Sequence, residues 1–263
     1  MSYLDTNRHY YDRLARSEAQ FAKPADRDEL RHPVETLGGL QWLGGSVRGQ
    51  RLLCLAAGGG RQAPLYAAAG AEVTVVDISP QMLSLDRQVA TENELTLSTV
   101  ETSMEDLSML AGTHFDVVIQ PVSTCYIPDI TVVYREVARV IRGGGIYISQ
   151  HKQPISLQSS LEPSATGYEL IHPYYHDGAL PATTQPNRIR ETGAVEYLHR
   201  WEEVIGGMCR SGFVVEDLLE PMHADRDSAE GKFAHRSLFV PPYVRIKARR
   251  IGSSKDAIIT KGL

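Results

Sequence analysis

Three consecutive glycines and one carboxylate are the first residues of this sequence whose types and spacing could do chemistry. Gly58, Gly59 and Gly60 follow the apolar run 52–55, and Asp77 comes 17 residues after Gly60, at the end of a β-branched run. Glycines let the backbone approach a ligand where a Cβ would collide. A carboxylate placed beside such a turn can accept the hydroxyl hydrogens of a ribose. The pattern therefore predicts a site for a nucleoside-containing cofactor.

The elements that must position these residues are a strand, a turn, a helix and a second strand. Residues 52–55 have the pattern of a buried parallel strand that stops at the glycine turn. The small apolar residues after Arg61 suit a helix that packs closely on a sheet, with Pro64 in its first turn, and residues 72–76 form the next strand. Because the crossover of such a βαβ unit is right-handed, the turn and Asp77 lie at the same edge of the sheet.

More than one interpretation fits this unit. Residues 58–63, GGGRQA, match the dinucleotide fingerprint G-x-G-x-x-G/A, which predicts an NAD(P)-binding oxidoreductase. That alternative needs a second nucleotide half, which we do not find in the sequence, and a hydride-side pair such as Y-x-x-x-K. Residues 243–247 (YVRIK) have this spacing, but they lie in the expected last strand. A glycine turn that only packs a helix on a strand is the structural alternative.

Several segments, in order, resemble the motifs of class I S-adenosylmethionine-dependent methyltransferases, in particular the small-molecule group of methyltransferase type 11. The segments are 52–60, 75–83, 101–107 (ETSMEDL), 115–119 (FDVVI) and 134–145. Ordered matches of this kind are more specific than a glycine motif alone. The resemblance implies an α/β fold: a Rossmann-like seven-stranded, mostly parallel sheet with helices on both faces and an antiparallel last strand.

The resemblance also implies which residues bind S-adenosylmethionine. The N-terminal segment often folds over the cofactor in this family, so a tyrosine there could cover the sulfonium, although aromatic packing within the helix explains it equally well. The backbone N–H of Met104 would face the adenine. The implied cofactor-binding set is Ala56, Ala57, Gly58, Gly60, Asp77, Ile78, Met82, Ser103, Met104, Glu105, Gln120 and Tyr11.

The sequence departs from the family pattern at three positions. Cys54 replaces the acid of the first strand, Ala56 replaces the first glycine of the turn, and Ser103 stands where the family often has Asp. A non-catalytic S-adenosylmethionine-binding protein is compatible with these changes. A protein or nucleic-acid methyltransferase would be expected to carry an N-P-P-Y-like tetrapeptide after the fourth strand, and residues 120–123 are QPVS.

Methyl transfer from a sulfonium is an in-line displacement, so holding the donor and the nucleophile collinear is the enzyme's main task. Where the acceptor is a hydroxyl or a carbon acid, a histidine suits proton removal. His151 follows the predicted strand 146–150 directly and is our candidate base, with His172 and His176 behind it. The tyrosine-rich segment 152–192 favours a partly aromatic or apolar small-molecule acceptor.

The pattern predicts three parts: an N-terminal helical cap over 1–45, the methyltransferase domain over 46–250 with an acceptor-recognition insertion at about 152–192, and a mobile tail over 251–263. The cap would contain a helix over 5–22, a loop over 22–31 and a helix over 32–43. Further expected helices are 79–93, 129–142 and 194–211, and further expected strands are 97–101, 115–119, 213–218 and 237–248.

Composition excludes several classes of protein. The 263 residues are 42% hydrophobic and 22% charged, with a net charge of −5, which argues against a nucleic-acid surface. We expect no membrane span, and the three cysteines (Cys54, Cys125 and Cys209) indicate neither a disulfide framework nor a metal site. Cys125 is expected to be buried and inert. The cytoplasm is the expected location, and a homodimer is left open.

Overall fold

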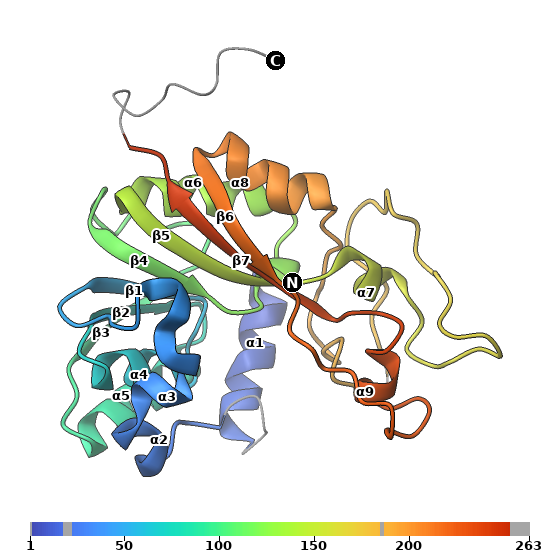
Figure 1. The fold of residues 1–263 in the computed structure, drawn as a ribbon, viewed down its shortest axis with the longest axis horizontal. Helices are drawn as coiled ribbons and strands as arrows, with labels where there is room; N and C mark the ends of the chain where they lie inside the picture. The colour runs from blue at the N-terminus through green and yellow to red at the C-terminus, as the bar shows by residue number, and fades with distance from the viewer. Residues whose placement is uncertain (1, 18–22, 185–186, 253–263) are drawn as a thin grey trace.

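A seven-stranded sheet forms the centre of the computed structural model, which describes residues 2–17, 23–184 and 187–252 (Figure 1). The strand order is β3-β2-β1-β4-β5-β7-β6. β1 to β5 are parallel, and β7 is antiparallel to both β5 and β6. The predicted fold class is confirmed. The strands are β1 (Arg51–Leu55), β2 (Glu72–Asp77), β3 (Leu97–Glu101), β4 (Phe115–Gln120), β5 (Ile141–Lys152), β6 (Phe213–Leu219) and β7 (Tyr243–Arg250).

Helices cover both faces of the sheet, and side chains that alternate along β1 pack into the hydrophobic core on each face. Leu53 and Leu55 pack on the face covered by α6 (Ile130–Val140), the π-helical turn η4 (Glu202–Gly206) and α8 (Gly207–Arg210). Leu52 and Cys54 pack on the opposite face with residues of η2 (Gly38–Leu43), α4 (Gln62–Ala68) and α5 (Pro80–Glu92). Apolar residues at every position, as in β1, are typical of a parallel strand that is buried on both faces.

The start of α5 is fixed close to the end of β2. Ser79 caps the helix, and its Oγ accepts a hydrogen bond from the Met82 N–H at 3.1 Å. Pro80 occupies the first helical position, where its missing N–H costs no hydrogen bond. Strand β2 and helix α5 are therefore separated by only two residues, which holds Asp77 at the edge of the sheet.

The helix α1 (Tyr3–Arg16) and the irregular chain between β5 and η4 together cover the carboxyl edge of the sheet, and we call them the cap. The chain between β5 and η4 extends past the edge around the short helix α7 (Pro154–Gln158) (Figure 1). The short helix α9 (Phe233–Arg236) precedes β7. A small apolar cluster, with Tyr126, Leu157 and Leu198 among its members, joins this cap to the domain.

The predicted helix 194–211 is wrong over its first seven residues. The chain there is not helical, because Tyr197 pairs with Ala179 and its N–H donates to the Cys125 carbonyl at 2.7 Å. Tertiary hydrogen bonds thus override the helical spacing of the apolar residues. Among the described residues of the insertion, β-pairing is limited to isolated bridges such as Ser159 with Leu170.

Other boundaries differ from prediction. The strand expected over 146–150 spans 141–152, so His151 lies within it rather than after it. The expected loop 22–31 contains α2 (Arg27–Arg31), which Asp26 caps. The expected helix 32–43 divides into α3 (Pro33–Thr36) and η2, because Gly39 and Leu40 have positive φ. Strand β7 begins at Tyr243 rather than at 237, since two prolines precede it. Residues 18–22 of the expected N-terminal helix, and 253–263 of the expected tail, lie outside the described residues.

Candidate functional site

A cavity of about 430 Å³ lies at the carboxyl ends of the parallel strands. Four neighbouring strands contribute to it through Asp77 of β2, residues 56–59 after β1, residues 121–123 after β4, and Gln150 and Lys152 of β5. Since β1 and β4 lie between β2 and β5, three strand spacings, or about 14 Å, separate the two ends of the cavity. The cavity can therefore hold a nucleoside at one end and a second, small molecule at the other.

Asp77 is bound to the glycine turn at the first end of the cavity. Its Oδ2 accepts the Gly58 N–H at 2.9 Å, and its Oδ1 accepts the Ser79 N–H at 2.9 Å. A Cβ on Gly58 would lie 2.8 Å from Met82 Cβ and 3.0 Å from Asp77 Oδ2, so only glycine fits there. Burial raises the pKa of Asp77 to about 6, although the backbone N–H groups oppose the shift.

Asp86, which the sequence analysis missed, holds the other two glycines of the turn. Its carboxylate accepts the Gly59 N–H at 3.1 Å and the Gly60 N–H at 3.0 Å, and the residue is fully buried. Asp86 lies on the buried face of α5, one turn after Leu83, so its helical spacing was an available signal. It supplies, from α5, a carboxylate that the first strand lacks at Cys54. Burial raises its pKa to about 7.

Most of the predicted cofactor residues line this cavity. Three do not, and each supports the wall from behind. Gly60 faces Asp86, Glu105 accepts hydrogen bonds from the Tyr3 hydroxyl at 2.9 Å, and Gln120 donates to Met104 Sδ at 3.3 Å. The predicted residues that do line the cavity are Ala56, Ala57, Gly58, Asp77, Ile78, Met82, Ser103, Met104 and Tyr11.

His151 does not line the cavity, and its predicted role as the general base is not supported. Side chains alternate along a strand, so Gln150 and Lys152 face the cavity while His151 faces away from it. The ring is buried between the hydroxyls of Thr124 and Ser149, each 2.8 Å from a ring nitrogen. Burial lowers the pKa of His151 to about 3, so the ring stays neutral. His172 and His176 do not line the cavity either.

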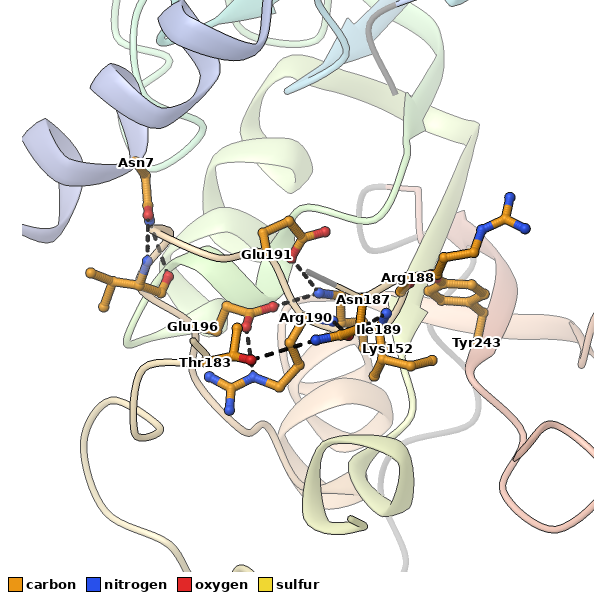
Figure 2. Close-up of polar contacts among 11 residues, drawn as sticks. Asn7, Lys152, Thr183, Asn187, Arg188, Ile189, Arg190, Glu191, Glu196 and Tyr243 are labelled. Atoms are coloured by element: carbon orange, nitrogen blue, oxygen red, sulfur yellow. Dashed lines mark hydrogen bonds and ion pairs between the residues drawn. The ribbon is translucent and has the colours of Figure 1, made fainter. Parts of the chain in front are cut away.

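A cluster of charged side chains forms the second end of the cavity (Figure 2). The Lys152 ammonium donates to Glu191 Oε2 at 2.7 Å and also to Glu196 Oε1, and Arg190 Nε donates to Glu196 Oε2 at 2.7 Å. Burial alone would lower the pKa of Lys152, but Glu191 and Glu196 raise it. Burial would raise the pKa of Glu191, but the Lys152 ammonium lowers it. Lys152 and Glu191 therefore form a charged pair at neutral pH.

Tyrosines surround this charged pair. Tyr10, Tyr11, Tyr126 and Tyr243 all line the cavity. The Tyr11 ring meets Tyr10 and Tyr126 edge to face, with centroids 5.2 Å and 5.6 Å away. Lys152 Nζ lies 5.5 Å from the centroid of the Tyr126 ring. The second end of the cavity thus combines aromatic surface with the Lys152–Glu191 pair.

Asn7 fastens α1 over the cavity (Figure 2). Its side chain donates to the Tyr126 carbonyl at 3.1 Å and the Val195 carbonyl at 3.2 Å, and it accepts the Val195 N–H at 2.7 Å. The residue is 2% exposed. One side chain therefore connects α1 both to Tyr126, which lines the second end of the cavity, and to Val195.

Cys125, which was expected to be inert, is buried, and burial raises its pKa above that of a free thiol.

Within residues 2–17, 23–184 and 187–252, no helix has the length and apolar character that crossing a bilayer requires.

A family model described as a methyltransferase domain matches residues 53–149, which include the glycine turn and Asp77. The chain is 36% identical over 177 residues to the uncharacterized methyltransferase YbaJ of Bacillus subtilis, covering 66% of this chain and 69% of that protein. It is 27% identical over 137 residues to a ubiquinone biosynthesis O-methyltransferase of Bordetella avium, covering 51% of this chain and 56% of that protein.

Solved methyltransferases share the fold. An S-adenosylmethionine-dependent methyltransferase from Mesorhizobium loti superposes with a TM-score of 0.64 at 21% identity, over 78% of this chain and 93% of that one. The geranyl diphosphate C-methyltransferase of Streptomyces coelicolor superposes with a TM-score of 0.63 at 15% identity, over 95% and 99%.

Proposed function

The chain belongs to the class I S-adenosylmethionine-dependent methyltransferases, and we propose that its acceptor is a small molecule bound between the glycine turn and the Lys152–Glu191 pair. The observation that carries this proposal is that one cavity contains both the nucleoside end and the aromatic end. S-adenosylmethionine would supply the methyl group from its sulfonium, and the thioether would be the leaving group. The chain's own residues bind the two partners and hold them in line.

The residues at the first end fit this cofactor. Asp77 is held rigidly by two backbone N–H groups, and each carboxylate oxygen can accept a further hydrogen bond, as ribose hydroxyls require. The glycine turn brings the backbone to the cavity without a Cβ at residue 58. We propose that the adenine is enclosed by Ile78, Met82, Ser103 and Met104, and that Tyr11 covers the methionine part. Gly60, Glu105 and Gln120 are proposed as supporting residues.

The shape of the second end favours a small acceptor over a macromolecule. Helix α1, fastened by Asn7, and the insertion both border the cavity there. An extended polypeptide or nucleic acid would have to displace these segments. The relatives named above, a ubiquinone biosynthesis O-methyltransferase and a geranyl diphosphate C-methyltransferase, act on small molecules and support this proposal.

The proposal is tested by following the methyl group. The protein is incubated with isotopically labelled S-adenosylmethionine and a cell extract that is separated into low-molecular-weight, protein and nucleic-acid fractions. We expect the label to transfer to the low-molecular-weight fraction. Label found only in the protein or nucleic-acid fraction would contradict a small-molecule acceptor.

We also propose the division into a helical cap (1–45), a methyltransferase domain (46–250) and a tail (251–263), a cytoplasmic location and a homodimer. Three free cysteines support a reducing compartment. Light scattering of the purified protein and fractionation of the cells that produce it test the last two points.

A further inference from the structure

We propose that the acceptor is an aromatic molecule with a ring hydroxyl, and that Glu191 binds this hydroxyl and takes its proton. This inference rests on the proposed function, because it assigns the second end of the same cavity. Its evidence is the arrangement of Lys152, Glu191 and Glu196 (Figure 2), together with the tyrosines that line the same end.

Glu191 is the charged group that this end of the cavity offers to a ligand. The Lys152 ammonium is already directed to two carboxylates and to the face of Tyr126, and its side chain is only 2% exposed. Glu196 is fully buried between Lys152 and Arg190. The Glu191 side chain keeps 19% of its surface exposed, and its neighbours are Lys152, Glu196 and the Tyr126 hydroxyl. Since the two oxygens of a carboxylate offer about four acceptor positions, a position remains for a ligand. The cavity therefore selects a hydrogen-bond donor.

A hydroxyl satisfies this carboxylate and can still react. An oxygen that donates its hydrogen to Glu191 keeps lone pairs that can attack a methyl group. An alkylammonium bound there would have no lone pair, and no histidine is among the described residues that line the cavity. A hydroxyl acceptor therefore needs only the group that the structure shows.

The tyrosines indicate that the hydroxyl is attached to an aromatic ring. Tyr10, Tyr11, Tyr126 and Tyr243 offer ring faces and edges, with which planar rings pack favourably. A phenolic hydroxyl also has a pKa of about 10, as in tyrosine, which is low enough for a carboxylate to assist proton loss in a transition state. Both the wall and the proton chemistry favour a phenol.

The proposed step balances in atoms and charge. The hydroxyl oxygen forms a bond to the methyl carbon while the methyl–sulfur bond breaks, and that electron pair stays on sulfur. The hydroxyl proton moves to Glu191, which later returns it to water. Lys152 acts as the positioning residue, because its ammonium orients Glu191 and keeps it ionised.

The test compares the wild type with Glu191→Gln, and uses Glu169→Gln as a control on an exposed glutamate of the same insertion. Binding of phenol, 4-nitrophenol and 2-naphthol to the protein saturated with S-adenosylhomocysteine is measured by calorimetry. Turnover of the same probes with S-adenosylmethionine is measured between pH 6 and 10. Binding of S-adenosylhomocysteine alone shows whether each variant is folded.

We expect Glu191→Gln to bind S-adenosylhomocysteine normally and to lose roughly 100-fold in kcat with phenol. The deficit should shrink as pH rises and with 4-nitrophenol, because an ionised hydroxyl no longer needs a base. A purely structural role would not produce this pattern. The inference is overturned if none of the probes binds, or if Glu191→Gln turns them over like Glu169→Gln. Failure of the wild type to bind S-adenosylhomocysteine would instead overturn the proposed function.

Discussion

Asp86 and Asp77 hold the glycine turn through the carboxylates of two neighbouring elements. Each accepts two backbone N–H groups, and both are shielded from water, so their pKa values rise to about 7 and about 6. In this chain the first strand carries Cys54, and the buried carboxylate that contacts the turn from the opposite side comes from Asp86 of α5.

The raised pKa of Asp86 predicts how stability depends on pH. Between the unfolded pKa near 4 and the folded pKa of about 7, the folded state binds the extra proton, so stability falls as pH rises through this window. From pH 5 to pH 8 this group should remove about 2 kcal/mol. Asp86→Asn should reduce the difference between urea unfolding free energies at the two pH values. Asp227→Asn, on an exposed aspartate, is the control, and an equal slope in both variants would contradict the account.

Ala56 is strained, because it replaces the family's glycine at a position with a φ of +49°. A left-handed conformation costs an L-residue about 1 to 2 kcal/mol, and glycine costs about 0.4 to 1 kcal/mol through the unfolded chain. Ala56→Gly should therefore stabilise the protein by about 0.5 to 1 kcal/mol in urea unfolding. The same change within helix α4, Ala67→Gly, should destabilise it by about 1 kcal/mol. A loss of stability in Ala56→Gly would argue against strain at this residue.

At the scale of elements, the βαβ units could be predicted and the insertion could not. Local apolar periodicity determines β1, α4, β2 and α5, and their predicted bounds lie within a residue or two of the observed ones. The partners of residues 152–200 are distant in sequence, as the Tyr197 N–H bond to Cys125 shows. Glu191 could not be identified from the sequence, because its place in the cavity is recognised only through its contact with Lys152, which lies 39 residues earlier.

Strand β5 shows that two successive residues can differ in whether they reach the cavity. His151 and Lys152 are neighbours, but alternation directs only Lys152 into the cavity. The sequence indicated the end of the strand and gave no means to determine which of two successive residues faces the ligand. The histidine was chosen for its chemistry, and the register favours the lysine.

Helix α1 should depend on Asn7 for its position. Removal of this side chain leaves the buried carbonyl of Tyr126 and the partly buried N–H and carbonyl of Val195 without this partner, which costs about 1 to 3 kcal/mol. In Asn7→Ala we expect faster amide hydrogen exchange throughout α1 and at the Val195 N–H, and a higher KM for the acceptor. Arg16→Ala, at the exposed end of the same helix, should change neither quantity. Unchanged exchange in Asn7→Ala would show that other contacts suffice.

At the scale of the whole molecule, the sheet order brings the parts of the site together. Asp77 and Lys152 come from strands that are separated by β1 and β4, and α1 and the insertion close the cavity over them. The two ends are built differently. One consists of the backbone and carboxylates of the parallel βαβ units, and the other consists of tyrosines from α1, β7 and the segment after β4 with the Lys152–Glu191 pair, which joins β5 to the insertion. This division matches a common cofactor and a specific acceptor.

The measurement that tests the central claim most directly is a calorimetric titration with S-adenosylmethionine, S-adenosylhomocysteine and NAD(H). It compares the wild type, Asp77→Ala and the exposed control Asp227→Ala. We predict that the wild type and the control bind both sulfur nucleosides, and that Asp77→Ala binds them roughly 100-fold more weakly, because two charge-assisted hydrogen bonds are lost. Binding of NAD(H) alone, or undiminished S-adenosylmethionine binding in Asp77→Ala, would contradict this account of the site.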